Sequence, residues 1–563
     1  MNISKILLSA LSLLALNLFA VEYFNTNRWV PTRPEIVKPY KYLEKGASSI
    51  TLRGIEGQPW VYFQVSPLKI AGGNKVLVKF TASGKGVMKA GFNAYTNGFS
   101  GTKEFSQKIE LSSESKEYSV ELGASSSYKL ARPILVMMPG SEAVITAYSV
   151  EITGKSYAGT AVADRADAMY KAGENADFTV TFTCNGEPVR TGKALIEYRV
   201  DNIFKKYEYF DLAKANPFTV SVKLDQPGFF LAYGYLKDDR NRDIIKRFQL
   251  TSAGFDAEKI TPAKAAPADL ITYWKGEYEK LKKNTSNDVQ MTKWKEDAKF
   301  TWYKLTCDTA NGKKSYSTLR VPKGAGKYPM IFTVPPAGYT TYTLDNYKLF
   351  PPEKKWDKVI HLIISVHDKP YMSHDEYMKF QRPDYYFYQL GTTRESYYYY
   401  NAVLGVMRMM EYAMKNVKEW DGKHLAALGR SQGGGFAFIM AALNPAIQAV
   451  GADVPALCDH HARLAGRFAG WPQLLDHAKG KAFGEHAPYF DAANFASFVK
   501  VPAVVSVGFF DTMCVPASVY SAYNVLQGEK KIINYPAYGH GWGKRDSLFH
   551  LAVWELFDKT FAK

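Results

Sequence analysis

The chain has 563 residues, of which 46% are hydrophobic and 22% are charged, a balance that excludes an intrinsically disordered protein. Its length exceeds what one hydrophobic core organises, so we expect about three or four domains. The formal net charge is +17, but the lysines and arginines form no dense block and no nucleic-acid motif. We therefore predict a basic solvated surface and no nucleic-acid partner.

Residues 1–20, MNISKILLSALSLLALNLFA, have the pattern of a secretory signal peptide. Lys5 precedes an apolar stretch of about fifteen residues, and the stretch ends at a candidate small-residue cleavage site, Leu18-Phe-Ala20. The stretch is too short to span a membrane, and no later segment is long and apolar enough to do so. We expect an exported protein, periplasmic or extracellular, with no membrane span.

Two β-rich regions follow the signal peptide. Residues 21–155 alternate apolar and polar side chains in short runs, as at 75–80 and 144–152, and predict an all-β sandwich. Residues 156–255 form a second β stretch, with strand-like runs at 177–183 and 229–235, and their length suits an immunoglobulin-like sandwich.

The pattern changes after a linker rich in proline and alanine, TPAKAAPADL, at residues 261–270. Helical stretches such as 270–283 now alternate with buried strands such as 359–365. This alternation predicts a largely parallel sheet with helices on both faces. We assign residues 256–563 to an α/β hydrolase domain, so the chain is a multidomain protein with two all-β sandwiches before it.

Residues 427–438, ALGRSQGGGFAF, place Ser431 inside a GxSxG pattern. A short buried strand at 424–428 precedes the pattern and a helix at 436–443 follows it. Strand, glycine turn and helix are the setting of a nucleophile elbow, in which the serine stands at the top of the sheet. The amide of Gln432 is then placed to donate to a developing oxyanion.

A serine nucleophile needs a base and an acid, which in α/β hydrolases follow it in the order Asp or Glu, then His. Asp511 lies on the loop after a predicted strand at 501–508. His540 lies between two glycines on the loop after the next strand, 531–536. We predict that Ser431, Asp511 and His540 form a catalytic triad.

A second oxyanion donor is expected after an earlier strand, 329–334. Pro335 and Pro336 have no N–H, so the available amides are those of Ala337, Gly338 and Tyr339.

Metal catalysis is the weaker interpretation of the other histidines. Adjacent residues such as those of Asp459-His460-His461 point in different directions on a helix, and His367 and His374 belong to no HExxH motif. His550 falls within a predicted C-terminal helix. The four cysteines, Cys184, Cys307, Cys458 and Cys514, are too few for a disulfide framework, and buried free thiols are favoured over a Cys458 to Cys514 pair.

Residues 265–563 resemble the acetyl xylan esterase and cephalosporin-C deacetylase family, carbohydrate esterase family seven. The matching segments are SQGGG at 431–435, DxxCxP at 511–516 with AYN at 522–524, His540, VPxLCD at 454–459, YYY at 397–399, Arg408 with Glu411, and Asp269 to Trp274. The resemblance implies deacetylation of acetylated polysaccharide or oligosaccharide without a cofactor. It also implies that Gln432 and Tyr339 donate the oxyanion amides. The first β-rich region is similar to carbohydrate-binding jelly rolls.

Three positions depart from the family pattern. The family's HGY is Ala337-Gly-Tyr339, the arginine after YYY is Tyr400, and an acidic residue is replaced by Gly405. Two alternatives stay open: a serine peptidase of the prolyl-oligopeptidase kind, and a glycan-binding protein with an inactive hydrolase domain. Oligomeric state is left undetermined by the sequence.

Overall fold

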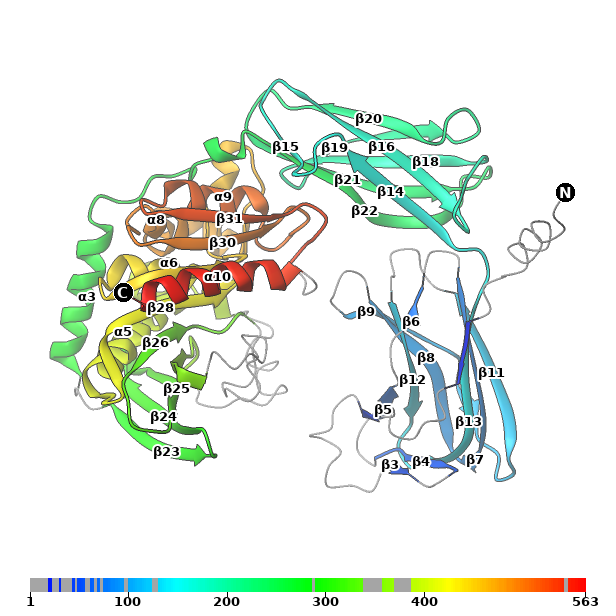
Figure 1. Ribbon diagram of the computed structural model, residues 1–563, viewed down its shortest axis with the longest axis horizontal. Coiled ribbons are helices and arrows are strands. Elements are labelled where there is room, and N and C mark those ends of the chain that lie inside the picture. Colours follow the sequence, from blue (N-terminus) through cyan, green and yellow to red (C-terminus); the bar gives the residue numbers. More distant parts are fainter. Residues whose placement is uncertain are drawn as a thin grey trace, which may run out of the picture.

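The structure, a computed structural model, describes residues 19–22, 30–31, 43–45, 48–55, 61–64, 68–70, 74–95, 100–123, 130–285, 289–337, 357–368, 386–540 and 545–562. Gly338, Tyr339 and His374 lie outside these residues. Figure 1 shows β-rich regions in the first half of the chain and a mixed α/β region in the second.

Two antiparallel sheets form the first β-rich region. One has the order β11-β7-β13-β4-β3 with β1 beside β13, and comprises β1 (Phe19–Glu22), β3 (Leu43–Lys45), β4 (Ile50–Arg53), β7 (Lys75–Lys85), β11 (Lys116–Gly123) and β13 (Glu142–Thr153). The other comprises β2 (Val30–Pro31), β5 (Val61–Gln64), β6 (Leu68–Lys69), β8 (Val87–Tyr95), β9 (Ser100–Phe105), β10 (Ile109–Glu110) and β12 (Leu130–Met137). Alternate residues of both sheets, such as Val78 and Phe92, share one core. Strand β1 runs across the predicted cleavage site, so cleavage after Ala20 would leave Val21 and Glu22 in it.

Two further sheets form the second β-rich region. The smaller contains β14 (Tyr157–Ala163), β16 (Asn175–Cys184), β17 (Glu187–Pro188) and β20 (Phe218–Lys223). The larger has the order β15-β22-β21-β18-β19 and comprises β15 (Met169–Tyr170), β18 (Lys193–Val200), β19 (Ile203–Asp211), β21 (Gly228–Lys237) and β22 (Asp243–Phe255). Phe178 of one sheet meets Phe230 of the other at 5.9 Å between ring centres, within a shared core.

A nine-stranded sheet organises the α/β region, in the order β23-β24-β25-β27-β26-β28-β29-β30-β31. The strands from β27 to β31 in this order run parallel, and β23 to β25 add an antiparallel edge. Their bounds are β23 (Gln290–Glu296), β24 (Phe300–Asp308), β25 (Lys314–Pro322), β26 (Tyr328–Thr333), β27 (Ile360–Ile364), β28 (Trp420–Arg430), β29 (Ile447–Asp453), β30 (Ala503–Gly508) and β31 (Lys530–Tyr535).

Helices cover both faces of this sheet. The side chains of Phe549, Val553 and Phe557 on helix α10 pack against one set of alternate strand residues, while the other helices pack against the alternate set. The helices are α3 (Leu270–Asn284), α5 (Tyr398–Asn416), α6 (Gln432–Leu443), α7 (Ala478–Ala482), α8 (Ala492–Ala496), α9 (Pro516–Val525) and α10 (Arg545–Phe561). The 3₁₀ turns are η3 (Ala257–Lys259), η4 (Ala310–Gly312), η6 (Tyr386–Tyr388), η7 (Arg394–Ser396), η8 (Ala462–Ala465), η9 (Leu474–Asp476) and η10 (Ala487–Phe490). Within the described ranges, no helix has both the length and the apolar character needed to cross a bilayer.

The predicted strands at 329–334, 359–365, 501–508 and 531–536 and the helix at 270–283 are confirmed to within two residues at each end. The elements around Ser431 are longer than predicted: β28 begins at Trp420, and α6 begins at Gln432 rather than at residue 436. The glycines after Ser431 are helical despite their poor helix propensity. A Cβ on Gly433 would lie 2.0 Å from the carbonyl oxygen of Val334, so glycine is needed for the close packing of this first turn against the loop after β26.

Candidate active site

Ser431 occupies a sharp turn between strand β28 and helix α6. Its backbone has φ 54° and ψ −119°, a conformation rarely adopted by residues other than glycine. The Ser431 N–H donates to the carbonyl oxygen of Asp453 at 2.9 Å, and the residue is 7% exposed. A Cβ on Gly429 would lie 2.2 Å from the backbone of Gly433, so the turn closes only with glycine there. The predicted nucleophile elbow therefore has the expected local geometry.

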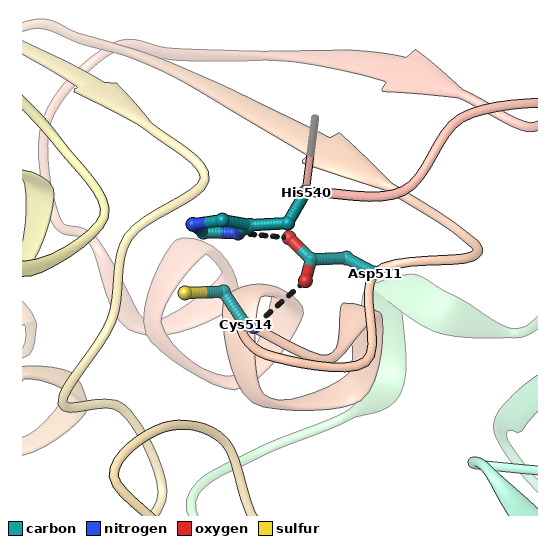
Figure 2. A group of neighbouring side chains, drawn as sticks. All are labelled: Asp511, Cys514 and His540. Carbon is teal, nitrogen blue, oxygen red and sulfur yellow. Dashed lines mark hydrogen bonds and ion pairs between the residues drawn. The ribbon is translucent and has the colours of Figure 1, made fainter. Parts of the chain in front are cut away.

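Asp511 and His540 meet at the ends of β30 and β31, the last two parallel strands of the sheet. Asp511 follows β30 and is completely buried, whereas the side chain of His540, after β31, is 23% exposed. His540 Nδ1 lies 2.7 Å from Asp511 Oδ2, and the other carboxylate oxygen accepts the N–H of Cys514 at 2.9 Å (Figure 2). The same oxygen accepts the N–H of Met513 at 2.8 Å.

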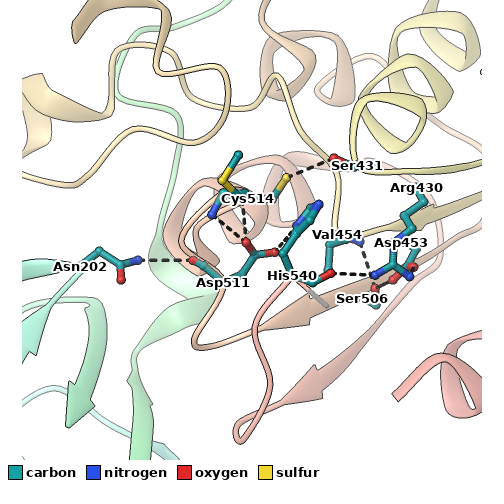
Figure 3. Close-up of polar contacts among 10 residues, drawn as sticks. Asn202, Arg430, Ser431, Asp453, Val454, Ser506, Asp511, Cys514 and His540 are labelled. Carbon is teal, nitrogen blue, oxygen red and sulfur yellow. Dashed lines mark hydrogen bonds and ion pairs between the residues drawn. The ribbon is translucent and has the colours of Figure 1, made fainter. Parts of the chain in front are cut away.

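This hydrogen bond determines which imidazole nitrogen is available for chemistry. A carboxylate only accepts, so Nδ1 carries the proton and Nε2 is left with its lone pair. In Figure 3 the outer end of the imidazole points toward the side of the site where Ser431 lies. The arrangement suits His540 as a general base, oriented by Asp511.

Cys514 is a second potential nucleophile beside the serine. Its Sγ lies 3.9 Å from Ser431 Oγ, and the residue is 1% exposed. Burial, together with the nearby Asp511 carboxylate, raises the pKa of the Cys514 thiol well above its usual value. Because the thiolate is the nucleophilic form, Cys514 stays a neutral packing partner of Ser431.

Asp511, Cys514 and His540 also have donor atoms within 4.8 Å of one another, a geometry compatible with a metal site. Their chemistry does not fit one. Both oxygens of Asp511 are already engaged, and the raised pKa of the thiol opposes the thiolate that a metal requires. The three residues therefore fit hydrogen bonding better than metal ligation.

The side chain of Gln432 is fixed from three directions. Its Oε1 accepts the hydroxyl groups of Tyr386 and Tyr399 at 2.7 and 2.6 Å, and its Nε2 donates to the carbonyl oxygen of Pro335 at 3.1 Å. Gln432 is 1% exposed and is the first residue of α6. Its backbone N–H is one of the helix N-terminal donors that have no partner within the helix. Tyr339, the other predicted donor, lies outside the described residues.

A buried ion pair, not predicted from the sequence, contacts the backbone of His540. Arg430 Nη1 lies 2.7 Å from Asp453 Oδ2, and Arg430 Nη2 donates to the backbone oxygen of His540 at 2.8 Å (Figure 3). The hydroxyl of Ser506 donates to the second carboxylate oxygen of Asp453. Asp453 and Ser506 lie on β29 and β30, so the strand-end reasoning that identified Asp511 could have identified Asp453 too.

The second β-rich region contacts both loops that carry the acid and the base. Ser252 Oγ donates to the carbonyl oxygen of Pro536 at 2.7 Å, on the loop before His540. Asn202 Nδ2 lies 3.4 Å from the carbonyl oxygen of Asp511, and Tyr233 packs edge-on against Phe510 at 5.3 Å. Sequence patterns gave no signal for these contacts.

Three other histidines, His367, His460 and His550, have the surroundings of structural rather than catalytic residues. His367 is buried, and its Nδ1 lies 2.7 Å from the hydroxyl of Tyr398; burial lowers its pKa to about 3. His460 is fully buried, and burial lowers its pKa to about 3 as well. The neighbouring Asp459 pairs with Arg467 at 2.7 Å. His550 lies on helix α10, as predicted.

All four cysteines are free thiols, as favoured from the sequence. Two residues that depart from the family pattern, Tyr400 and Gly405, make close contacts with other residues. Tyr400 donates its hydroxyl to Glu277 at 2.6 Å, and a Cβ on Gly405 would lie 2.8 Å from Ser315. A tyrosine and a glycine thus fill the positions where the family pattern has two charged residues.

Comparison with known proteins relates this chain to one family of esterases. The sequence model of the acetyl xylan esterase family matches residues 255–550, just over half of the chain. Acetyl esterase Axe7A of Xylanibacter ruminicola is 26% identical over 435 residues, which cover 75% of this chain and 94% of that protein. A match of this length extends upstream of the hydrolase region into the β-rich part.

Two solved structures are also similar to this chain. The acetyl xylan esterase from Paenibacillus sp. R4 has 20% identity and a TM-score of 0.45, covering 54% of this chain and 98% of that one. Acetyl xylan esterase 1 from Thermoanaerobacterium sp. JW/SL YS485 has 18% identity and a TM-score of 0.43, with the same coverage.

Proposed function

Because the chain belongs to the acetyl xylan esterase family, we propose that it is an exported serine esterase that removes acetyl groups from polysaccharide or oligosaccharide. The observation that carries the mechanism is the 2.7 Å bond between the buried Asp511 carboxylate and His540, beside a serine in a strained elbow. A strained turn persists only where the surrounding structure imposes it, and such turns cluster at active sites.

The reaction proceeds through an acyl-enzyme. Ser431 Oγ attacks the acetyl carbonyl carbon while His540 Nε2 takes its proton. The amides of Gln432 and Tyr339 stabilise the oxyanion, and His540 returns the proton to the departing sugar oxygen. Water then attacks the acetyl-serine by the same steps and releases acetate. Asp511 holds the imidazole and stabilises its charged form.

The rest of the organisation is proposed from the sequence. Residues 1–20 are a signal peptide, residues 21–155 and 156–255 are two sandwich domains, and residues 256–563 are the catalytic domain. Export to the periplasm or the extracellular space follows from the signal peptide.

Acetate release from 4-nitrophenyl acetate and from acetylated xylan tests this function, with a 4-nitroanilide peptide as the amide control. We expect release from both esters and no cleavage of the amide. Cleavage of the amide alone would show a peptidase. A folded protein that hydrolyses none of the three would contradict the esterase assignment.

A further inference from the structure

Strand β19, at the edge of the five-stranded sheet, carries three exposed aromatic side chains. Phe204, Tyr207 and Tyr209 are 44%, 52% and 54% exposed, and Phe204 and Tyr207 contact each other at 4.9 Å between ring centres. We call these three residues the aromatic strip. Large apolar side chains exposed side by side are uncommon on a soluble protein and mark binding surfaces.

All three side chains project from one face of the sheet. In the antiparallel ladder they pair with Arg199, Glu197 and Leu195 of β18, and directly paired residues share a face. The intervening residues of β18, such as Ile196, point into the core of the second β-rich region. The aromatic strip therefore lies on the outer face of the sheet.

The same outer face covers the loop that carries the catalytic acid. Glu197 pairs with Tyr233 of β21, and Tyr233 packs on Phe510, the residue before Asp511. Strands are spaced about 4.8 Å apart, so the β19 backbone at Tyr207 lies about 10 Å from that of Tyr233. Two buried residues, Glu197 and Tyr233, thus connect the aromatic strip with the acid loop across the sheet.

The start of β19 is anchored at the acid loop. Asp201 and Asn202, both with positive φ, form the two-residue turn between β18 and β19. Asp201 accepts the N–H of Phe229 at 2.9 Å, and Asn202 reaches the carbonyl oxygen of Asp511 (Figure 3). The aromatic strip begins two residues after this contact and runs away from it.

A buried polar cluster lies beside the aromatic strip on the same face of the sheet. Glu197, 2% exposed, accepts bonds from Arg199 at 2.5 Å, from Arg247 at 2.9 Å and from the Tyr235 hydroxyl at 3.0 Å. Burial would raise the pKa of Glu197, but the hydrogen bonds from Arg247 and Arg199 lower it to about 2. This cluster fixes the side chain of Glu197, which is paired with Tyr207 in the ladder.

We propose that the aromatic strip binds the sugar chain of the polymeric substrate and guides it toward Ser431. The C–H faces of sugar rings pack on aromatic rings, and the tyrosine hydroxyls offer hydrogen bonds at a wet surface. A second copy adding a strand to β19 fits less well, because Lys206 and Glu208 alternate with the tyrosines and charged side chains discourage edge pairing. The inference rests on the proposed esterase function, which supplies the acetylated glycan.

The test compares Phe204→Ala/Tyr207→Ala/Tyr209→Ala with Lys206→Ala/Glu208→Ala, which alters the opposite face of the same strand. We expect the triple variant to lose at least about tenfold in kcat/KM on acetylated xylan and to keep its rate on 4-nitrophenyl acetate. Tyr207→Phe/Tyr209→Phe keeps the rings and should retain most of the polymer activity. Equal losses on both substrates, or none on xylan, would overturn the proposal.

Binding is measured separately from turnover, so that a failure of the esterase assignment is distinguishable. In the Ser431→Ala background, affinity electrophoresis with soluble deacetylated xylan should show retardation that the triple substitution abolishes. Xylan retardation unaffected by the triple substitution would refute the aromatic strip as a glycan site even if the enzyme is active. The proposal would also be refuted if the triple substitution dissociated a dimer in sedimentation and left glycan binding unchanged.

Discussion

Arg430→Met is expected to destabilise the protein and to impair catalysis, each through a different contact of the arginine. Arg430 and Asp453 have side chains only 7% and 4% exposed and form one ion pair at 2.7 Å. Removing the guanidinium leaves a buried carboxylate whose remaining partner is the hydroxyl of Ser506, which costs about 3–5 kcal/mol. The same change removes the 2.8 Å bond to the His540 carbonyl, a charged hydrogen bond of about 1.5–3 kcal/mol.

The double variant Arg430→Met/Asp453→Asn separates these two effects. The neutral amide can still accept the Ser506 hydroxyl, so most of the lost unfolding free energy should return. The His540 carbonyl remains without its donor, so kcat/KM on 4-nitrophenyl acetate should stay about 10- to 100-fold below wild type in both variants.

Denaturant unfolding and steady-state kinetics on the wild type, Arg430→Met, Asp453→Asn and the double variant supply the measurements. Activity that returns together with stability would refute a positioning role for Arg430. Loss of stability without any loss of activity in Arg430→Met would refute it as well.

Three further variants test neighbouring parts of the account. Asp511→Asn should lower kcat/KM on 4-nitrophenyl acetate by about 10³- to 10⁴-fold, because an amide favours the wrong tautomer of the histidine, and a variant within tenfold of wild type would contradict this. Burial raises the pKa of Asp201 from 3.8 to about 6, so the folded state binds this proton more tightly than the unfolded state does. The protonated form of Asp201 stabilises the folded state at pH 4. As the pH rises to about 6 this contribution is lost, and the free energy of unfolding falls by about 3 kcal/mol. Asp201→Asn should remove this loss in denaturant titrations at pH 4 and 7.5, and an unchanged pH dependence would count against it. Tyr386→Phe/Tyr399→Phe removes both hydroxyl donors to Gln432 and should lower kcat/KM about tenfold, because the oxyanion donor is less ordered. Parallel denaturant titrations check the fold. An unaltered rate would show that these bonds do not position Gln432.

The catalytic candidates could be predicted because each lies at the end of a strand that is visible in the sequence. Apolar runs at 501–508 and 531–536 fix two strands, and the parallel sheet brings the loops after them, with Asp511 and His540, to one edge. The early start of helix α6 could not be predicted in this way. Its glycines are poor helix formers, and only the close approach of the Val334 carbonyl to Gly433 explains them.

Contacts between distant segments could not be predicted from the sequence either. Asn202 and Asp511 are 309 residues apart, and nothing in either local pattern indicates that the β18–β19 turn lies on the acid loop. The Arg430 side chain likewise acts through a carbonyl oxygen after another strand, a contact set by the twist and register of the sheet.

The most direct test of the central claim is to identify the nucleophile with a fluorophosphonate probe and peptide mass spectrometry. Wild-type protein should take up one label on Ser431. Cys514→Ala should still be labelled, and Ser431→Ala should not, because Cys514 lies only 3.9 Å away but is held as a neutral thiol. A label on any other residue, or labelling that persists in Ser431→Ala, would contradict the proposed serine esterase mechanism.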